Sequence, residues 1–197
     1  YCETMVDIIM SRGGVIDKYI GDAIMAFFGA PVKHDDDANQ AVKAAVEMQL
    51  ALAKFNAELK AAGRPPFITG IGINYGIVTV GNIGSEKKMD YTIIGDMVNL
   101  GSRLEGLTKP YKQEIIVSES VHRKVHEEIP CRMVDKVIVK GKTVPENIYT
   151  VKKSLSAAEK KVWEYHAAAM KKYYQRDFEG AARFFMGIKK LMPKDFL

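Results

Sequence analysis

The chain has 197 residues, of which 47% are apolar and 27% charged, a balance typical of a folded globular protein and not of a disordered one. No stretch approaches the roughly 18 uninterrupted apolar residues of a membrane span. Its two cysteines, Cys2 and Cys131, are too few for a zinc cluster or a disulfide framework. A cytosolic, reducing setting fits this composition best.

The net charge of +5 is unevenly distributed along the chain. Residues 1–155 carry 20 basic and 19 acidic side chains, whereas residues 156–197 carry 9 and 5. A nearly neutral body lacks the clustered cationic field that nucleic-acid binding requires, so no nucleic-acid partner is expected. We expect two units, a body over residues 1–153 and an α-helical extension over residues 154–197.

The first predicted elements are a helix and a β-hairpin. Apolar residues recur at helical spacing over residues 1–11. Residues 15–20 and 23–28 are then two apolar runs rich in β-branched and aromatic side chains. The dipeptide Gly21-Asp22 between them is a two-residue turn signal. These runs therefore predict a hairpin with Asp22 at its tip.

A long helix and a second hairpin are predicted next. The acidic run at residues 34–37 suits a helix N-terminus, and apolar side chains then recur every three or four residues until Gly63. The second hairpin is predicted over residues 67–83 with its turn at Tyr75-Gly76. A polar loop is predicted over residues 85–90.

The rest of the chain completes an α+β pattern. The remaining body elements are a strand over 91–94, a helix over 95–107, a strand over 114–117, a helix over 118–128 and an antiparallel pair over 132–139 and 147–151. This order predicts a mostly antiparallel central sheet with helices packed on it. Ser156 then caps the first of two amphipathic helices, which predict an αα-hairpin similar in spacing to one tetratricopeptide unit.

One candidate for chemistry is the turn that carries Asp22. Lys18 lies four residues earlier, and an undisturbed strand would direct both side chains to one face. A carboxylate on a tight turn suits a phosphate-bound cation, because Mg²⁺ takes one or two protein carboxylates together with substrate oxygens. An ordinary turn aspartate is the alternative interpretation.

A second candidate is the pair Asn99 and Arg103, which lie four residues apart and share one face of the predicted helix. An asparagine can orient a ribose by hydrogen bonds, and an arginine can hold developing charge on a phosphoryl group. A solvated helix face is the alternative interpretation of this pair.

Three segments together are far more specific than either candidate. The runs DKYIGDAIMAFFGAP, DYTIIGDMVNLGSRLE and VIVKGKTVPENIYTV resemble the class III nucleotidyl cyclase catalytic domain, in order and spacing, from about residue 1 to residue 151. The resemblance implies the ferredoxin-like cyclase fold. It also implies an adenylate cyclase that converts ATP to cyclic AMP and pyrophosphate, through attack of the ribose 3′-hydroxyl on the α-phosphate.

The resemblance assigns roles to residues around the first candidate. It implies that Asp22 is one of two metal-binding aspartates, for two Mg²⁺ or Mn²⁺ ions per site. Lys18 and Thr92 are implied to select the purine, and a Lys–Thr pair implies ATP. A threonine at this position is typical of one subgroup of adenylate cyclases.

The resemblance also assigns roles to the second candidate pair and to a lysine near the end of the body. Asn99 is implied to position the ribose, Arg103 to stabilise the transition state, and Lys140 to contact the triphosphate. The family places its sites at a dimer interface, and this chain carries residues of both half-sites. A symmetric homodimer that binds ATP is therefore expected.

The sequence departs from the family at its start. The family's first strand, which bears the other metal-binding aspartate, should precede residue 1, so this chain is expected to have little or no activity by itself. An upstream sensor or membrane segment is expected in the parent protein, with the catalytic domain in the cytoplasm. The alternatives are a non-catalytic cyclase-like module for dimerisation or regulation, and a guanylate cyclase.

Overall fold

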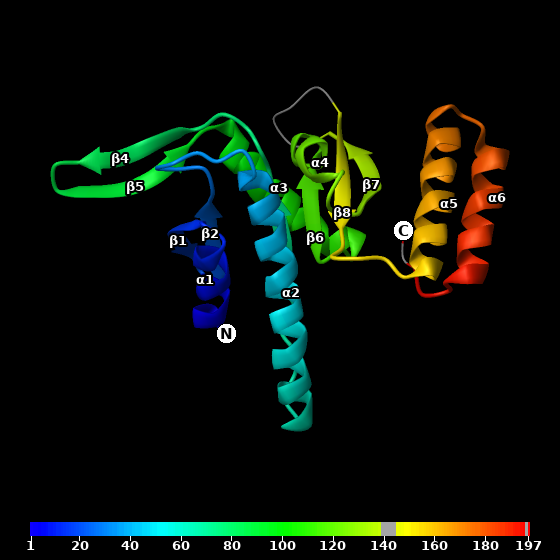
Figure 1. Ribbon diagram of the computed structural model, residues 1–197, viewed down its shortest axis with the longest axis horizontal. Coiled ribbons are helices and arrows are strands. Elements are labelled where there is room, and N and C mark those ends of the chain that lie inside the picture. The colour runs from blue at the N-terminus through cyan, green and yellow to red at the C-terminus, as the bar shows by residue number, and fades with distance from the viewer. Residues whose placement is uncertain (139–144, 196) are drawn as a thin grey trace.

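The computed structural model describes residues 1–138, 145–195 and 197, and combines helices with three sets of paired strands (Figure 1). The helices are α1 (Cys2–Ser11), α2 (Asp37–Ala61), α3 (Asp96–Tyr111), α4 (Glu119–Val125), α5 (Ala157–Tyr174) and α6 (Phe178–Leu191). The strands are β1 (Val15–Ile20), β2 (Ala23–Phe27), β3 (Ile71–Ile73), β4 (Thr79–Ser85), β5 (Lys88–Ile94), β6 (Ile115–Ser118), β7 (Cys131–Val137) and β8 (Glu146–Val151). The predicted α+β class is confirmed.

The central sheet is mixed. Its strand order is β3-β6-β8-β7, in which β3 and β6 run parallel and the other neighbours run antiparallel. Parallel neighbours need a crossover connection, and α3 lies in the segment that joins β3 to β6. The strands β1–β2 and β4–β5 form two separate antiparallel ribbons, of which β4–β5 extends away from the sheet (Figure 1).

The hairpin predicted over residues 67–83 is wrong. Strand β3 pairs with β6, and β4 pairs with β5 around a turn at Glu86-Lys87, inside the segment predicted as a polar loop. Gly76 does not form a turn. It allows the Met97 side chain to pack closely against the backbone, because a Cβ atom at this position would lie 2.6 Å from Cγ of Met97. The Asn74 side chain also donates to the Met97 carbonyl oxygen at 2.9 Å. This segment therefore packs against the start of α3.

Strand β6 lies at the centre of the fold and packs on both faces. Ile115 and Val117 belong to a buried cluster with α2 and α4, whereas Ile116 belongs to another with Leu100 and Leu104 of α3. Successive side chains of a strand point to opposite faces, so this alternation places α2 and α4 on one face of the sheet and α3 on the other. The sheet thereby fixes the position of α3, which carries Asn99 and Arg103.

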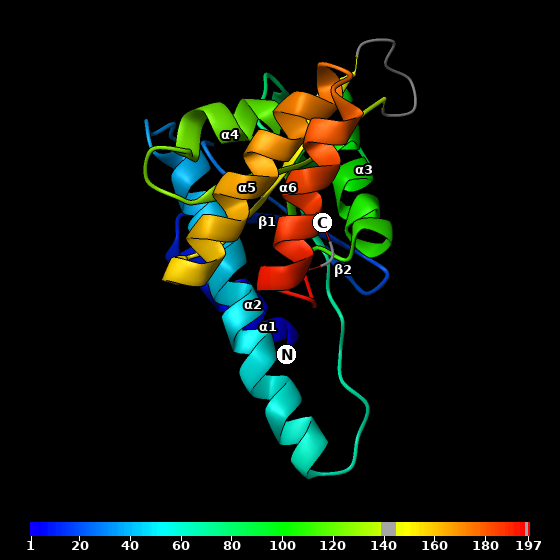
Figure 2. The same ribbon diagram turned by 90° about the vertical axis from the view of Figure 1, so that its right-hand side faces the viewer.

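Helices α5 and α6 lie side by side as the predicted helical pair (Figure 2). A buried ion pair joins the segment after α6 to the sheet, since Nη1 of Arg132 lies 2.7 Å from Oδ2 of Asp195. Nη2 of Arg132 also donates to the Leu197 carbonyl oxygen at 3.3 Å. Burial, and then the nearby Arg132, lower the pKa of His166 to about 4, so this histidine is neutral at pH 7.

One carboxylate connects the helical pair with α3. Asp135 on β7 accepts hydrogen bonds from the Tyr111 hydroxyl at the end of α3 and from the Tyr174 hydroxyl at the end of α5. The extension is thus attached to β7 of the central sheet and to α3, the helix that carries Asn99 and Arg103. The division of the chain at residue 153 stays a prediction.

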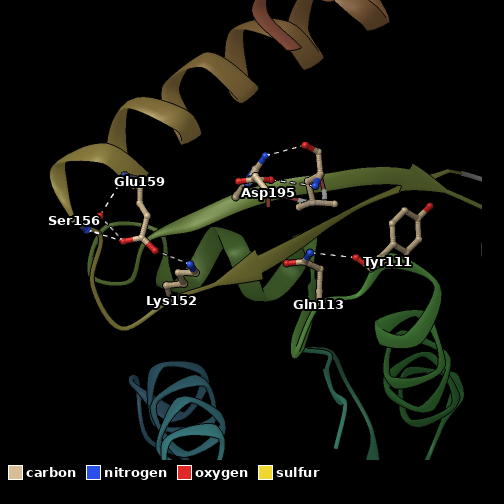
Figure 3. Close-up of polar contacts among 8 residues, drawn as sticks. Tyr111, Gln113, Lys152, Ser156, Glu159 and Asp195 are labelled. Atoms are coloured by element: carbon tan, nitrogen blue, oxygen red, sulfur yellow. Dashed lines mark hydrogen bonds and ion pairs between the residues drawn. The ribbon is translucent and has the colours of Figure 1, made fainter. Parts of the chain in front are cut away.

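A capping box begins α5. The Ser156 hydroxyl accepts from the Glu159 backbone N–H at 3.3 Å, and the Glu159 carboxylate accepts from the Ser156 backbone N–H at 2.8 Å. Lys152 donates to the same carboxylate at 2.7 Å (Figure 3). The bond from Lys152 and then those from Ser156 lower the pKa of Glu159 to about 2.

We expect Ser156→Ala to lower the free energy of unfolding by about 1 kcal/mol at pH 7, because it removes the acceptor of the Glu159 backbone N–H. A carboxylate with a depressed folded-state pKa stabilises the fold above its ordinary pKa of about 4.3, and this contribution is lost as the pH falls toward 2. Glu159→Gln should therefore flatten the dependence of the free energy of unfolding on pH below pH 4.5. Urea unfolding measures both effects.

Ser154→Ala is the control for Ser156→Ala. A loss of stability in Ser154→Ala equal to that in Ser156→Ala would contradict the prediction.

Candidate active site

The β1–β2 hairpin presents Asp22 at its tip. The two strands pair antiparallel, from Val15 opposite Phe27 to Ile20 opposite Ala23, and the turn lies at Gly21-Asp22 as predicted. The Asp22 side chain is exposed there. Among the described residues, it forms no hydrogen bond or ion pair with any other candidate residue.

A β-bulge interrupts the hairpin at Asp17. Ile16 lies opposite Ala26 and Lys18 lies opposite Met25, so Asp17 is the extra residue on its strand. Neighbouring side chains of a regular strand point to opposite faces, but a bulge redirects the chain locally. Asp17 and Lys18 therefore both reach Thr92 on β5.

The three side chains form a compact polar cluster. Nζ of Lys18 donates to Oγ1 of Thr92 at 2.9 Å, and the Thr92 hydroxyl donates to Oδ2 of Asp17 at 2.6 Å. The Ile93 backbone N–H donates to the same carboxylate oxygen at 3.3 Å. Nζ of Lys18 also lies 2.9 Å from Oδ1 of Asp17 in an ion pair, although this second oxygen accepts no well-aligned hydrogen bond from a described residue.

Burial and charge oppose each other at Asp17. Its side chain is fully buried, whereas that of Lys18 is 44% exposed. Burial by itself disfavours the carboxylate, but the hydrogen bond from Thr92, the ammonium group of Lys18 and the Ile93 backbone N–H outweigh it and hold the pKa of Asp17 below its ordinary value. The cluster thus contains an ionised carboxylate behind an accessible ammonium group.

Helix α3 presents the other candidates. Gly95 precedes it with φ 156° and ψ 162°, a backbone conformation that is essentially restricted to glycine. Asn99 is exposed and Arg103 is half-buried one turn later on the same face. Arg103 makes no hydrogen bond or ion pair with another described residue. A shallow hollow of about 280 Å³ lies between the end of β5 and α3, lined in part by Gly95 and Asn99.

The described residues by themselves do not supply enough ligands to hold the two Mg²⁺ or Mn²⁺ ions that the resemblance implies. Across residues 1–138, 145–195 and 197, no group of three or more histidine, cysteine, aspartate or glutamate side chains could hold a metal ion. Asp22 supplies a single carboxylate. Lys140, which was expected to contact the triphosphate, lies outside the described residues.

The structure thus brings Lys18 and Thr92 together, and it places Asn99 and Arg103 on one helix face. Asp17 is the residue that the analysis of the sequence missed. Its signal was its place next to Lys18 in an otherwise apolar strand, but strand alternation assigns adjacent residues to opposite faces. The bulge that overrides this alternation has no glycine or proline to mark it in the sequence.

The fold and these motifs define a nucleotidyl cyclase catalytic domain. The chain belongs to the family described as the adenylate and guanylate cyclase catalytic domain, whose family model matches residues 4–153. Domains of this family bind nucleotides, dimerise and are generally metal-dependent. None of the described helices has the length and apolar character needed to cross a membrane.

Curated relatives include adenylate cyclases. The chain is 45% identical over 159 residues to the adenylate cyclase of Anabaena cylindrica. The aligned residues cover 77% of this chain and 31% of that protein. It is 35% identical over 195 residues to the terminal-differentiation-specific adenylate cyclase of Dictyostelium discoideum, covering 95% of this chain and 9% of that protein. The chain therefore spans less than a third of the length of these relatives.

Solved structures include cyclases of both kinds. The adenylyl cyclase CyaB from P. aeruginosa is 36% identical with a TM-score of 0.72, over 79% of this chain and 80% of that chain. The guanylyl cyclase Cya2 is 40% identical with a TM-score of 0.67, over 76% of this chain and 75% of that chain. Overall similarity therefore does not separate ATP from GTP as the substrate, and the nucleotide must be argued from the site.

Proposed function

We propose that this chain is the catalytic part of a homodimeric adenylate cyclase, which forms cyclic AMP and pyrophosphate from ATP. The observation that carries the proposal is the contact between Lys18 and Thr92. An ammonium group donates to N1 of adenine, and a threonine oxygen accepts from the 6-amino group. Guanine presents the opposite pattern at these two positions, so this pair favours ATP.

Residues of α3 act on the sugar and phosphate. Asn99 orients the ribose so that its 3′-hydroxyl faces the α-phosphorus, and this positioning makes the attack effectively unimolecular. Arg103 donates to the phosphoryl oxygens as charge develops on them. Lys140 contacts the triphosphate. In a symmetric dimer, each site takes Lys18, Thr92, Asn99 and Arg103 from one chain and Asp22 from its partner.

Asp22 is proposed as a ligand for Mg²⁺ or Mn²⁺, with two ions per site. Its position on an exposed turn suits such a role, because the turn leaves the carboxylate free of competing partners among the described residues. The phosphates of the substrate are expected to supply some of the remaining ligands. Protein groups outside the described residues are expected to supply the others. Because the relatives are much longer, regulation by other segments of the parent protein is part of the proposal.

The test is to measure cyclic AMP formed from ATP and cyclic GMP formed from GTP by the full-length protein with Mn²⁺. We expect cyclic AMP to dominate. Equal or greater formation of cyclic GMP would instead support the second candidate, a guanylate cyclase, which the 40% identity to Cya2 favours. Formation of neither product by a dimeric protein would overturn the enzyme assignment in favour of a non-catalytic cyclase-like module.

A further inference from the structure

We propose that Asp17 is a positioning residue that determines specificity, because it fixes the direction of the Thr92 hydroxyl and so makes the base-binding pair select adenine over guanine nucleotides. The inference rests on the proposed function in one respect, namely that the purine of a nucleotide reaches Lys18 and Thr92. Asp17 acts through Thr92 and not by touching the nucleotide. Its side chain is fully buried behind the partly exposed Lys18.

The hydrogen bonds of the cluster can be satisfied in only one direction. An ionised carboxylate only accepts, an ammonium group only donates, and a hydroxyl has a single proton. Oγ1 of Thr92 lies 2.6 Å from Oδ2 of Asp17 and 2.9 Å from Nζ of Lys18. The Thr92 proton must therefore point at Asp17, while the Thr92 oxygen accepts from Lys18. Thr92 can therefore only accept a hydrogen bond from a ligand, through the remaining lone pair of Oγ1.

Three features hold Asp17 in this role. The bulge leaves Asp17 without a cross-strand partner in the hairpin, so its side chain can turn toward β5. The Ile93 backbone N–H holds Oδ2, and Nζ of Lys18 lies 2.9 Å from Oδ1. The lowered pKa of Asp17 keeps the group ionised at neutral pH, and it therefore remains an acceptor.

This polarity distinguishes the two purines. The 6-amino group of adenine donates, and it matches an oxygen that only accepts. O6 of guanine accepts, and it would face the Thr92 lone pair with no proton between them. A threonine hydroxyl that was free to rotate could donate to O6 and would tolerate both bases. Asp17 removes that freedom, because rotation would break the short bond from Thr92 and leave the buried Oδ2 with only the longer bond from the Ile93 backbone N–H.

Asp17→Ala tests the inference, because alanine removes the acceptor that holds the Thr92 proton and leaves no side-chain group at residue 17 that could accept it. The hydroxyl proton is then released toward the base. We would measure Kd for ATP and for GTP by competition with a fluorescent ATP analogue, using the full-length protein. The ratio of the GTP Kd to the ATP Kd should fall by on the order of tenfold. An unchanged ratio, or an equal loss of both affinities, would overturn the inference.

Two further variants keep the test specific. Asp90→Ala removes a different carboxylate, which lies on β5, is 58% exposed and is 3.6 Å from Nζ of Lys88, and it should leave the ratio unchanged. In a Thr92→Val background there is no hydroxyl to orient, so Asp17→Ala should no longer alter the ratio. A persistent effect in that background would show that Asp17 acts by another route and would overturn the inference.

The outcome also separates this inference from the proposed function. A shifted binding ratio in a protein that forms no cyclic nucleotide would uphold the role of Asp17 and reject the cyclase. Cyclic AMP formation with an unshifted ratio would reject the role of Asp17 alone. A protein that binds neither nucleotide would reject both.

Discussion

Arg103→Ala should lower the rate of cyclic AMP formation by about 100-fold or more, because it removes a donor that meets charge developing in the transition state. Arg103 is half-buried on α3 and makes no hydrogen bond or ion pair with another described residue. Its loss therefore leaves no partner unsatisfied, and the free energy of unfolding should change little. The measurement is kcat and KM for ATP with Mn²⁺, together with thermal unfolding of the same sample.

Arg64→Ala is the matched control, since it removes the same charge from an exposed position in the loop that follows α2. Its kcat should equal that of the unaltered protein. Arg103→Lys keeps the charge but loses the planar, two-pronged donor geometry, and it should recover only part of the rate. A normal kcat for Arg103→Ala would show that Arg103 does not stabilise the transition state, whatever the activity of the domain.

Much of this site could be predicted because its residues follow local rules. The glycine-containing turn placed Asp22 at a hairpin tip, and helical spacing placed Asn99 and Arg103 on one face; both arrangements appear in the structure. The resemblance to cyclases paired Lys18 with Thr92 across 74 positions of sequence, and their side chains are hydrogen-bonded. That pairing depends on the whole fold, and spacing by itself could not have found it.

Three features of the structure did not follow from the sequence, and two of them depend on long-range packing. Gly76 looked like a turn residue, but it lies where the Met97 side chain needs room. The polar run around Glu86-Lys87 looked like a loop, yet its backbone continues the β4–β5 ladder, where side-chain polarity costs little on an exposed ribbon. Asp17 was missed because a bulge changes the direction of a side chain without changing composition. At Gly76 and Asp17, a contact distant in sequence overrides a local preference; in the β4–β5 hairpin, a short turn at Glu86-Lys87 replaces the expected loop.

Gly72→Ala should damage both stability and activity, because it lies where α3 touches the sheet backbone to backbone. A Cβ atom on Gly72 would come within 2.2 Å of the Glu105 nitrogen and 2.4 Å of the Gly101 oxygen, both in α3. Backbone atoms cannot rotate away as a side chain can, so α3 must move off β3. Overpacking of this kind costs about 1–3 kcal/mol of stability.

The displacement of α3 should cost more in catalysis than in stability, because Arg103 lies between the two contact points and moves with them. A shift of about 1 Å in a positioned group can lower a rate 100-fold, so kcat should fall by that order in Gly72→Ala protein that is still folded. Gly106→Ala is the control on the same helix, since a Cβ atom there meets nothing within 4 Å. It should raise the free energy of unfolding by up to about 1 kcal/mol through helix propensity and leave kcat unchanged. If Gly72→Ala kept its normal kcat and unfolding midpoint, the contact between α3 and β3 would not be what positions Arg103, and the helix would have to be held by its buried face on β6 alone.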